Sequence, residues 1–127
     1  MKLFSSVLFG AVLAIANAVA SAGEMPFSKK AFDDLRAAGK PVVVHISAQW
    51  CGTCKVQARI VTPLLSAPEF KDLTLLQADF DKEKALLKAL KVANQSTFVA
   101  FKGSMEVGRS TGVTKKDDIA ALLRKAI

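Results

Sequence analysis

The chain has 127 residues, which is enough for one domain with a modest core and too few for two ordinary domains. Its 18 lysines and arginines outnumber its 11 acidic residues, but acids are interleaved with the cations, without the concentrated basic stripe of a nucleic-acid-binding protein. We therefore expect a single-domain monomer that does not bind nucleic acid and whose charges are mostly solvated surface.

The first residues have the three parts of a secretory signal peptide. Lys2 supplies a short basic region, and an apolar stretch follows from Leu3 to Val19. Small residues then precede two possible cleavage sites, after Ala20 and after Ala22, of which we favour the second.

These features predict a signal peptide over residues 1–22 and a mature domain over residues 23–127. The alternative is an uncleaved signal that anchors the chain in the inner membrane, because about 20 apolar residues can span a bilayer. The alanine-rich end of the segment, which contains Asn17, argues against that alternative.

A helix and then a strand follow the signal. Residues 27–38 carry apolar side chains at helical spacing, with Ser28 as the N-cap and Gly39 as the stop. Residues 41–47 are β-branched and apolar on both alternating faces, which is typical of a central strand covered from both sides. This strand leads directly into the cysteines.

A second helix is predicted from Cys51 to about Leu65. Pro63 and Pro68 mark its end or a bend. The side of this helix that is compatible with burial carries Val56, Ile60, Val61 and Leu64.

The remaining elements are, in order, a buried strand over residues 73–78, a short helix over 82–90, a strand over 97–101, an antiparallel edge strand over 105–110 and a helix over 115–126. Gly103 and Ser104 form the turn between the last two strands, and Thr114 is the expected N-cap of the last helix. Strands separated by helices imply parallel crossovers, and the closing hairpin adds an antiparallel half. We therefore expect an α/β fold with a mixed four-stranded sheet and helices on both faces.

Two cysteines, Cys51 and Cys54, are separated by only two residues. A disulfide across so short a loop constrains the unfolded chain little, so stability is a weak reason for it. Cys51 lies at the start of a helix, where unpaired N–H groups and the helix dipole stabilise a thiolate; we expect a lowered pKa and an exposed thiol. Cys54 can then attack a mixed disulfide at Cys51, release the substrate as a thiol and leave the pair oxidised.

Three neighbours of the cysteines, Trp50, Gly52 and Thr53, are predicted to bind substrate and to shape the chemistry of the pair. Trp50 is expected to form an apolar wall beside the sulfurs. Gly52 and Thr53 lie inside the closed ring and influence the reduction potential of the pair.

The segment that carries a family resemblance is Trp50-Cys51-Gly52-Thr53-Cys54, which follows an apolar strand and precedes Lys55. It resembles the active site of the thioredoxin superfamily, and residues 92–103 and Gly112 are similar to the second half of that fold. The exported setting and the stretch 67–70 are similar to periplasmic thioredoxin-like domains, including the C-terminal domain of the DsbD electron transporter. The resemblance implies a thioredoxin fold, a periplasmic location and no cofactor beyond the Cys51–Cys54 disulfide.

The resemblance also implies an enzyme, a thiol-disulfide oxidoreductase of the protein-disulfide reductase type. The Gly52-Thr53 pair lacks the histidine of strongly oxidising relatives, which favours reduction. The implied partners are disulfides or thiols of exported proteins, with a membrane thiol transporter of the DsbD or CcdA kind as electron donor. The alternatives are a disulfide oxidase or isomerase, and a non-catalytic thioredoxin-like binding module.

Two positions depart from the superfamily pattern. Ser96 stands where the family normally has a cis-proline, so we predict either a trans peptide or a strained cis peptide there. The backbone of Gln95, Ser96 and Thr97 is still expected to pair with an extended substrate.

His45, six residues before Cys51, stands where thioredoxins commonly bury an aspartate. It is a possible acceptor for the Cys54 proton; the alternative is a core histidine hydrogen-bonded to backbone. A zinc site of His45 and the two cysteines is disfavoured, because the strand points His45 into the sheet's interior and a fourth ligand is lacking. We therefore expect no metal site.

Overall fold

The computed structural model describes residues 10–11 and 23–127 of the chain. The predicted signal peptide and both of its possible cleavage sites lie outside the described residues, except for Gly10 and Ala11. Within the described part of the chain, no helix is long and apolar enough to cross a membrane.

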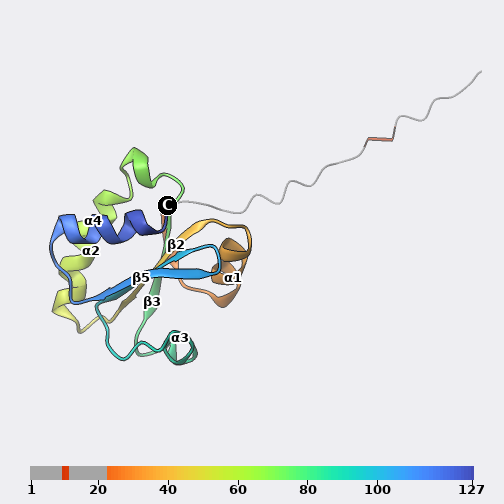
Figure 1. Ribbon diagram of the computed structural model, residues 1–127. Coiled ribbons are helices and arrows are strands. Elements are labelled where there is room, and N and C mark those ends of the chain that lie inside the picture. The colour runs from red at the N-terminus through yellow and green to blue at the C-terminus, as the bar shows by residue number, and fades with distance from the viewer. Residues whose placement is uncertain (1–9, 12–22) are drawn as a thin grey trace, which may run out of the picture.

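The described residues form a mixed five-stranded sheet in the order β1-β3-β2-β4-β5, shown in Figure 1. The strands are β1 (Gly23–Pro26), β2 (Pro41–Ser47), β3 (Thr74–Asp79), β4 (Thr97–Lys102) and β5 (Met105–Thr111). β1 and β2 pair with β3 in parallel, whereas β4 pairs antiparallel with both β2 and β5. The predicted mixed sheet is confirmed.

Helices cover both faces of this sheet (Figure 1). They are α1 (Lys29–Ala37), α2 (Gly52–Leu64), α3 (Lys84–Leu90) and α4 (Lys116–Lys125), with a short 3-10 helix, η1 (Pro68–Phe70). α1 and α3 pack on the face of β2 that carries Val42, Val44 and Ile46. α2 and α4 pack on the opposite face with Val43. Because successive strand side chains point to opposite faces, the all-apolar run in β2 supplies both cores.

The prediction of four strands was one too few, because β1 adds a parallel edge strand beside β3. Its register runs from Gly23 opposite Thr74 to Pro26 opposite Gln77. β1 has only four residues, and their side chains are exposed or half-buried. A short strand with a glycine and a proline lacks an alternating apolar pattern, and proline is tolerated at a sheet edge.

The predicted helix caps are confirmed at one helix and wrong at another. Ser28 caps α1, since its Oγ accepts the Ala31 N–H at 3.0 Å, and Gly39 follows the helix with φ of +71°. Thr114 does not cap α4, which begins one residue after an extended Lys115 and has no capping side chain. Two acidic residues in the first turn, Asp117 and Asp118, instead suit the positive end of the helix dipole.

The buried side of α2 also differs from the prediction. Val56 is exposed, whereas the neighbouring Gln57 is fully buried together with Val61. Residues 54, 57 and 61 follow helical spacing, so a polar side chain occupies the core-facing row where only apolar residues were predicted. Pro63 lies in the last turn of α2, one residue before the helix ends.

Candidate active site

Cys51 is the N-cap residue of α2, at the junction between β2 and this helix. Its backbone is extended, and its Sγ accepts the backbone N–H of Cys54 at 3.1 Å. A turn closed by the Cys51 N–H on the carbonyl of Ala48, at 3.1 Å, brings the chain from the strand into the helix. The sulfur therefore occupies the place that a serine or aspartate oxygen takes at an ordinary N-cap.

The two cysteines form a disulfide, with Cα atoms 5.3 Å apart. Cys51 is only 4% exposed and Cys54 3%, so the exposed Cys51 thiol that was predicted is not found in this oxidised state. Gly52 and Thr53, which lie between them, are exposed. Exposure does not distinguish the two sulfurs, so their different roles must come from their positions on α2.

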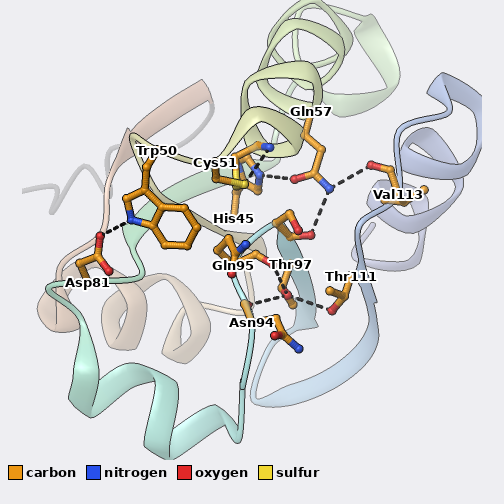
Figure 2. The surroundings of a disulfide bond; sticks show 12 residues. His45, Trp50, Cys51, Gln57, Asp81, Asn94, Gln95, Thr97, Thr111 and Val113 are labelled. Carbon is orange, nitrogen blue, oxygen red and sulfur yellow. Dashed lines mark hydrogen bonds between the residues drawn. A yellow bond between two sulfur atoms is a disulfide. The ribbon is translucent and has the colours of Figure 1, made fainter.

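The aromatic surroundings of the disulfide come from two segments. Phe80, immediately after β3, packs with Ala48 and the cysteines. Trp50 is 60% exposed, meets Phe80 edge-on with ring centroids 6.4 Å apart, and donates its indole N–H to Asp81 at 2.7 Å. Figure 2 shows the indole turned toward Asp81 at the rim of the site. Phe80 therefore lines the sulfurs, while Trp50 forms the outer edge of the site.

The sequence pattern does not single out Phe80 or Asp81, because they lie about thirty residues beyond the cysteines. The strand register brings them there: Ser47 pairs with Asp79, and the Phe80 N–H donates to the Ser47 carbonyl at 2.8 Å. The parallel strands β2 and β3 end at the same edge of the sheet, so the residues that follow them lie close together. Sequence reasoning could have found Phe80 and Asp81 from this rule.

The loop before β4 lies opposite the disulfide and has trans geometry, the first of the two predicted alternatives. The described residues contain no cis peptide, and Ser96 is buried in the left-handed region with φ of +53°. Its carbonyl accepts the Gly112 N–H at 2.8 Å and the Gln57 amide at 3.1 Å. Thr97 Oγ1 lies 2.9 Å from both the Asn94 carbonyl and the Thr111 hydroxyl.

These bonds tie the loop to α2 and β5 (Figure 2) and to Gly112, which follows β5. The Ser96 carbonyl is engaged inside the protein, so a substrate strand at this loop has to use other backbone groups. Substrate pairing at Gln95, Ser96 and Thr97 stays a prediction.

His45 is 1% exposed on β2, on the face covered by α2. Its Nε2 lies 2.9 Å from Gln57 Oε1 and its Nδ1 lies 3.0 Å from Gln77 Oε1. Its ring stacks on Phe98 with centroids 4.2 Å apart. The alternative of a core histidine bonded to backbone therefore needs a correction, since the partners are two glutamine side chains. The role of His45 as acceptor for the Cys54 proton stays a prediction.

Gln57 and Gln77 are functional candidates that the sequence pattern does not reveal on its own. Gln77 is directly opposite His45 in the parallel β2–β3 register, and Gln57 lies one turn after Cys54 on α2. Each glutamine lies among apolar residues on the core-facing side of its element, α2 or β3. This pattern could have identified both, because a buried polar side chain needs a hydrogen-bond partner.

Burial lowers the pKa of His45 below its ordinary value of 6.5, while hydrogen bonds to Gln57 and Gln77 and the charge of Glu24 act in the opposite direction. Below about pH 6.5 the unfolded chain protonates this histidine, whereas the buried imidazole stays neutral to a lower pH. The unfolded state then binds more protons, so the free energy of unfolding falls as the pH falls, by at most about 1.4 kcal/mol per pH unit.

Urea unfolding between pH 7.5 and 5 measures this fall in the free energy of unfolding. In the control His45→Gln, the part of the pH dependence that is due to His45 should disappear. Hydrogen bonds from Arg124 and Arg109 lower the pKa values of Glu69 and Glu106 in the folded protein. Their contribution to the slope therefore begins only near their ordinary value of 4.5, at the acidic end of this range, and is the same in wild type and His45→Gln. A wild-type slope that His45→Gln leaves unchanged would contradict the assignment.

No group of three histidine, cysteine or acidic side chains within residues 10–11 and 23–127 is arranged to hold a metal ion. The two sulfurs and the His45 ring do not make such a group, because both ring nitrogens face glutamine oxygens.

Comparison with known proteins identifies the family. The family model for thioredoxin matches residues 24–125. Thioredoxin from Chlamydia trachomatis is 34% identical over 100 residues, covering 77% of this chain and 93% of that protein. Thioredoxin H2-1 from Oryza sativa subsp. japonica is 34% identical over 94 residues, covering 71% of this chain and 67% of that protein.

Solved structures agree with this result. The crystal structure of Trxlp from Edwardsiella tarda EIB202 superimposes with a TM-score of 0.78 at 38% identity, covering 80% of this chain and 98% of that one. Thioredoxin F from spinach chloroplast gives a TM-score of 0.71 at 31% identity, covering 84% and 95%. The chain therefore belongs to the thioredoxin family, whose members act on protein disulfides; it is a thiol-disulfide oxidoreductase that carries the Cys51–Cys54 disulfide and needs no cofactor beyond it.

Proposed function

We propose that this protein reduces disulfide bonds of exported proteins, with Cys51 as the attacking thiol and Cys54 as the resolving thiol. The observation that carries the proposal is the position of Cys51 at the N-cap of α2, where its Sγ already accepts the Cys54 N–H. The same hydrogen bond and the positive end of the helix favour negative charge on this sulfur after reduction.

The reaction proceeds in two exchanges. In the reduced protein, the Cys51 thiolate attacks one sulfur of a substrate disulfide; the substrate S–S bond breaks, and its other sulfur leaves as a thiolate. Cys54 then gives its proton to a base, for which His45 is the proposed acceptor, and attacks Cys51 Sγ, which releases the second substrate thiolate and forms the Cys51–Cys54 disulfide. Two electrons pass from the protein's sulfurs to the substrate.

Reduction rather than oxidation is supported by the absence of histidine from the Gly52-Thr53 pair. In equilibrium with glutathione, we expect a reduction potential closer to the about −270 mV of thioredoxin than to the about −120 mV of a strong oxidant. The measurement uses the ratio of reduced to oxidised protein over a series of glutathione buffers. A potential near about −120 mV would contradict the reductase function and indicate a disulfide oxidase instead.

The exported setting is supported by the basic, apolar and small-residue order of residues 1–22. A reductant in an oxidising compartment needs an electron supply, and a membrane thiol transporter of the DsbD or CcdA kind is the donor we propose. Expression of the full chain in a bacterium, fractionation and mass determination test the location. A mature protein in the periplasm that begins at Gly23 or Ser21 supports export, whereas an uncleaved chain in the cytoplasm contradicts it.

One observation favours a second candidate, the non-catalytic binding module: both cysteines are less than 5% exposed. Insulin reduction by dithiothreitol separates the two functions. A catalyst accelerates this reaction in proportion to its concentration, whereas a binding module leaves the rate unchanged.

A further inference from the structure

Gln57 joins three parts of the active site while being completely buried. Its Nε2 lies 3.1 Å from the Ser96 carbonyl and 2.9 Å from the Val113 carbonyl, and its Oε1 lies 2.9 Å from His45 Nε2 (Figure 2). A carbonyl oxygen can only accept, so both amide hydrogens of Gln57 are committed to these two carbonyls. The orientation of the amide is thereby fixed, and its oxygen has to face His45.

This orientation determines the hydrogen on the imidazole. Gln57 Oε1 can only accept, so His45 Nε2 has to carry a hydrogen whether the ring is neutral or charged. In the neutral ring the lone pair then lies on Nδ1, which faces Gln77. Any proton that His45 takes up has to bind at this atom.

Gln77 suits both protonation states of Nδ1. When Nδ1 is protonated, it donates to Gln77 Oε1, which lies 3.0 Å away. When Nδ1 is bare, rotation of the amide presents an N–H instead. Gln77 is half-buried, and within the described residues its amide has no second hydrogen-bond partner, so nothing comparable to the two carbonyls of Gln57 fixes it.

We propose that Gln57 is a positioning residue that holds His45 as the Nε2–H tautomer, which makes Nδ1, facing Gln77, the proton-exchanging atom of the imidazole. This inference deepens the proposed function, because it names the atom at which a proton from Cys54 would arrive. The groups around the ring are Gln57 from α2, the helix that also carries both cysteines, Gln77 from β3 and the uncharged Phe98 from β4. Glu24 of β1 is the carboxylate whose charge acts on His45.

Nitrogen-15 NMR of the imidazole tests the proposal directly, since the chain has a single histidine. In the wild-type protein at pH 8 we expect a protonated-type resonance for Nε2 and an unprotonated-type resonance for Nδ1. In Gln57→Met, the remaining acceptor is Gln77 Oε1, so we expect the pattern to invert to Nδ1–H. The matched control Gln77→Met should keep the wild-type pattern, because Gln57 is intact.

An Nδ1–H tautomer in the wild type, or an unchanged tautomer in folded Gln57→Met, would overturn the proposal. The wild-type spectrum decides the first point even when the variant does not fold. The tautomer is measured in the oxidised protein, where no disulfide exchange takes place. Failure of the proposed reductase function would therefore leave this result standing, and an opposite tautomer would leave the chemistry of the cysteines intact.

Discussion

Cys51→Ser will abolish the reduction of insulin, and Cys54→Ser will stop turnover while retaining the substrate as a mixed disulfide on Cys51. The loss at Cys51 is expected to be chemical rather than structural. Serine is a preferred N-cap residue, and its Oγ can accept the Cys54 N–H that Cys51 Sγ accepts in the native protein. The hydroxyl, however, does not supply the thiolate that attacks a disulfide.

The measurement is insulin reduction with dithiothreitol for each variant, followed by mass spectrometry of the Cys54→Ser protein for a covalently held substrate. Lys88→Ala, an exposed change on α3 away from the cysteines, is the control and should retain near-native turnover. A Cys54→Ser protein that captures no substrate while Cys51 still reacts with an alkylating agent would favour the binding module over the oxidoreductase mechanism proposed here.

Phe98→Ala will cause the largest loss of stability that we predict, about 3–5 kcal/mol of unfolding free energy. Phe98 is fully buried in the core between the sheet and helices α2 and α4, and its ring stacks on His45. Removal of the Phe98 ring leaves a cavity beside His45. The surrounding residues cannot move in to fill this cavity without breaking the hydrogen bonds of His45. The loss is a large part of the about 5–15 kcal/mol that stabilises a typical domain.

Urea unfolding at pH 7.5 measures this loss. Phe27→Ala is the matched control, because Phe27 has the same side chain but is only partly buried at the edge of the opposite core. We expect the control to lose clearly less stability. Equal losses in the two variants would contradict the central packing role assigned to Phe98.

Most of the fold can be predicted from the sequence because its elements carry strong local patterns. The uninterrupted apolar run at residues 42–44 indicates a strand buried on both faces, and Ser28 and Gly39 limit the first helix. β1 has no such pattern, since its four residues gain their order from pairing with β3 at the sheet edge. The expected cap at Thr114 was wrong because α4 begins without a capping side chain.

The candidate site could be predicted only where it is local in the chain. Cys51 is the N-cap of α2 and Cys54 lies in its first turn, so their spacing in the sequence is enough. The partners of His45 depend instead on the β2–β3 register that places Gln77 opposite it, and on the rotation of α2 that buries Gln57 in place of Val56. A shift of one residue in the β2–β3 register would turn the strand side chains to the other face of the sheet. No short-range sequence pattern specifies that register.

The most direct test of the central claim, that the N-terminus of α2 makes Cys51 the attacking thiol, is timed alkylation of the reduced protein. The two cysteines are 4% and 3% exposed in the oxidised state, so accessibility alone predicts similar labelling. With limiting iodoacetamide at pH 7 and peptide mass spectrometry, we expect the label on Cys51 while Cys54 remains unmodified. Equal labelling of the two sulfurs, or faster labelling of Cys54, would contradict the claim.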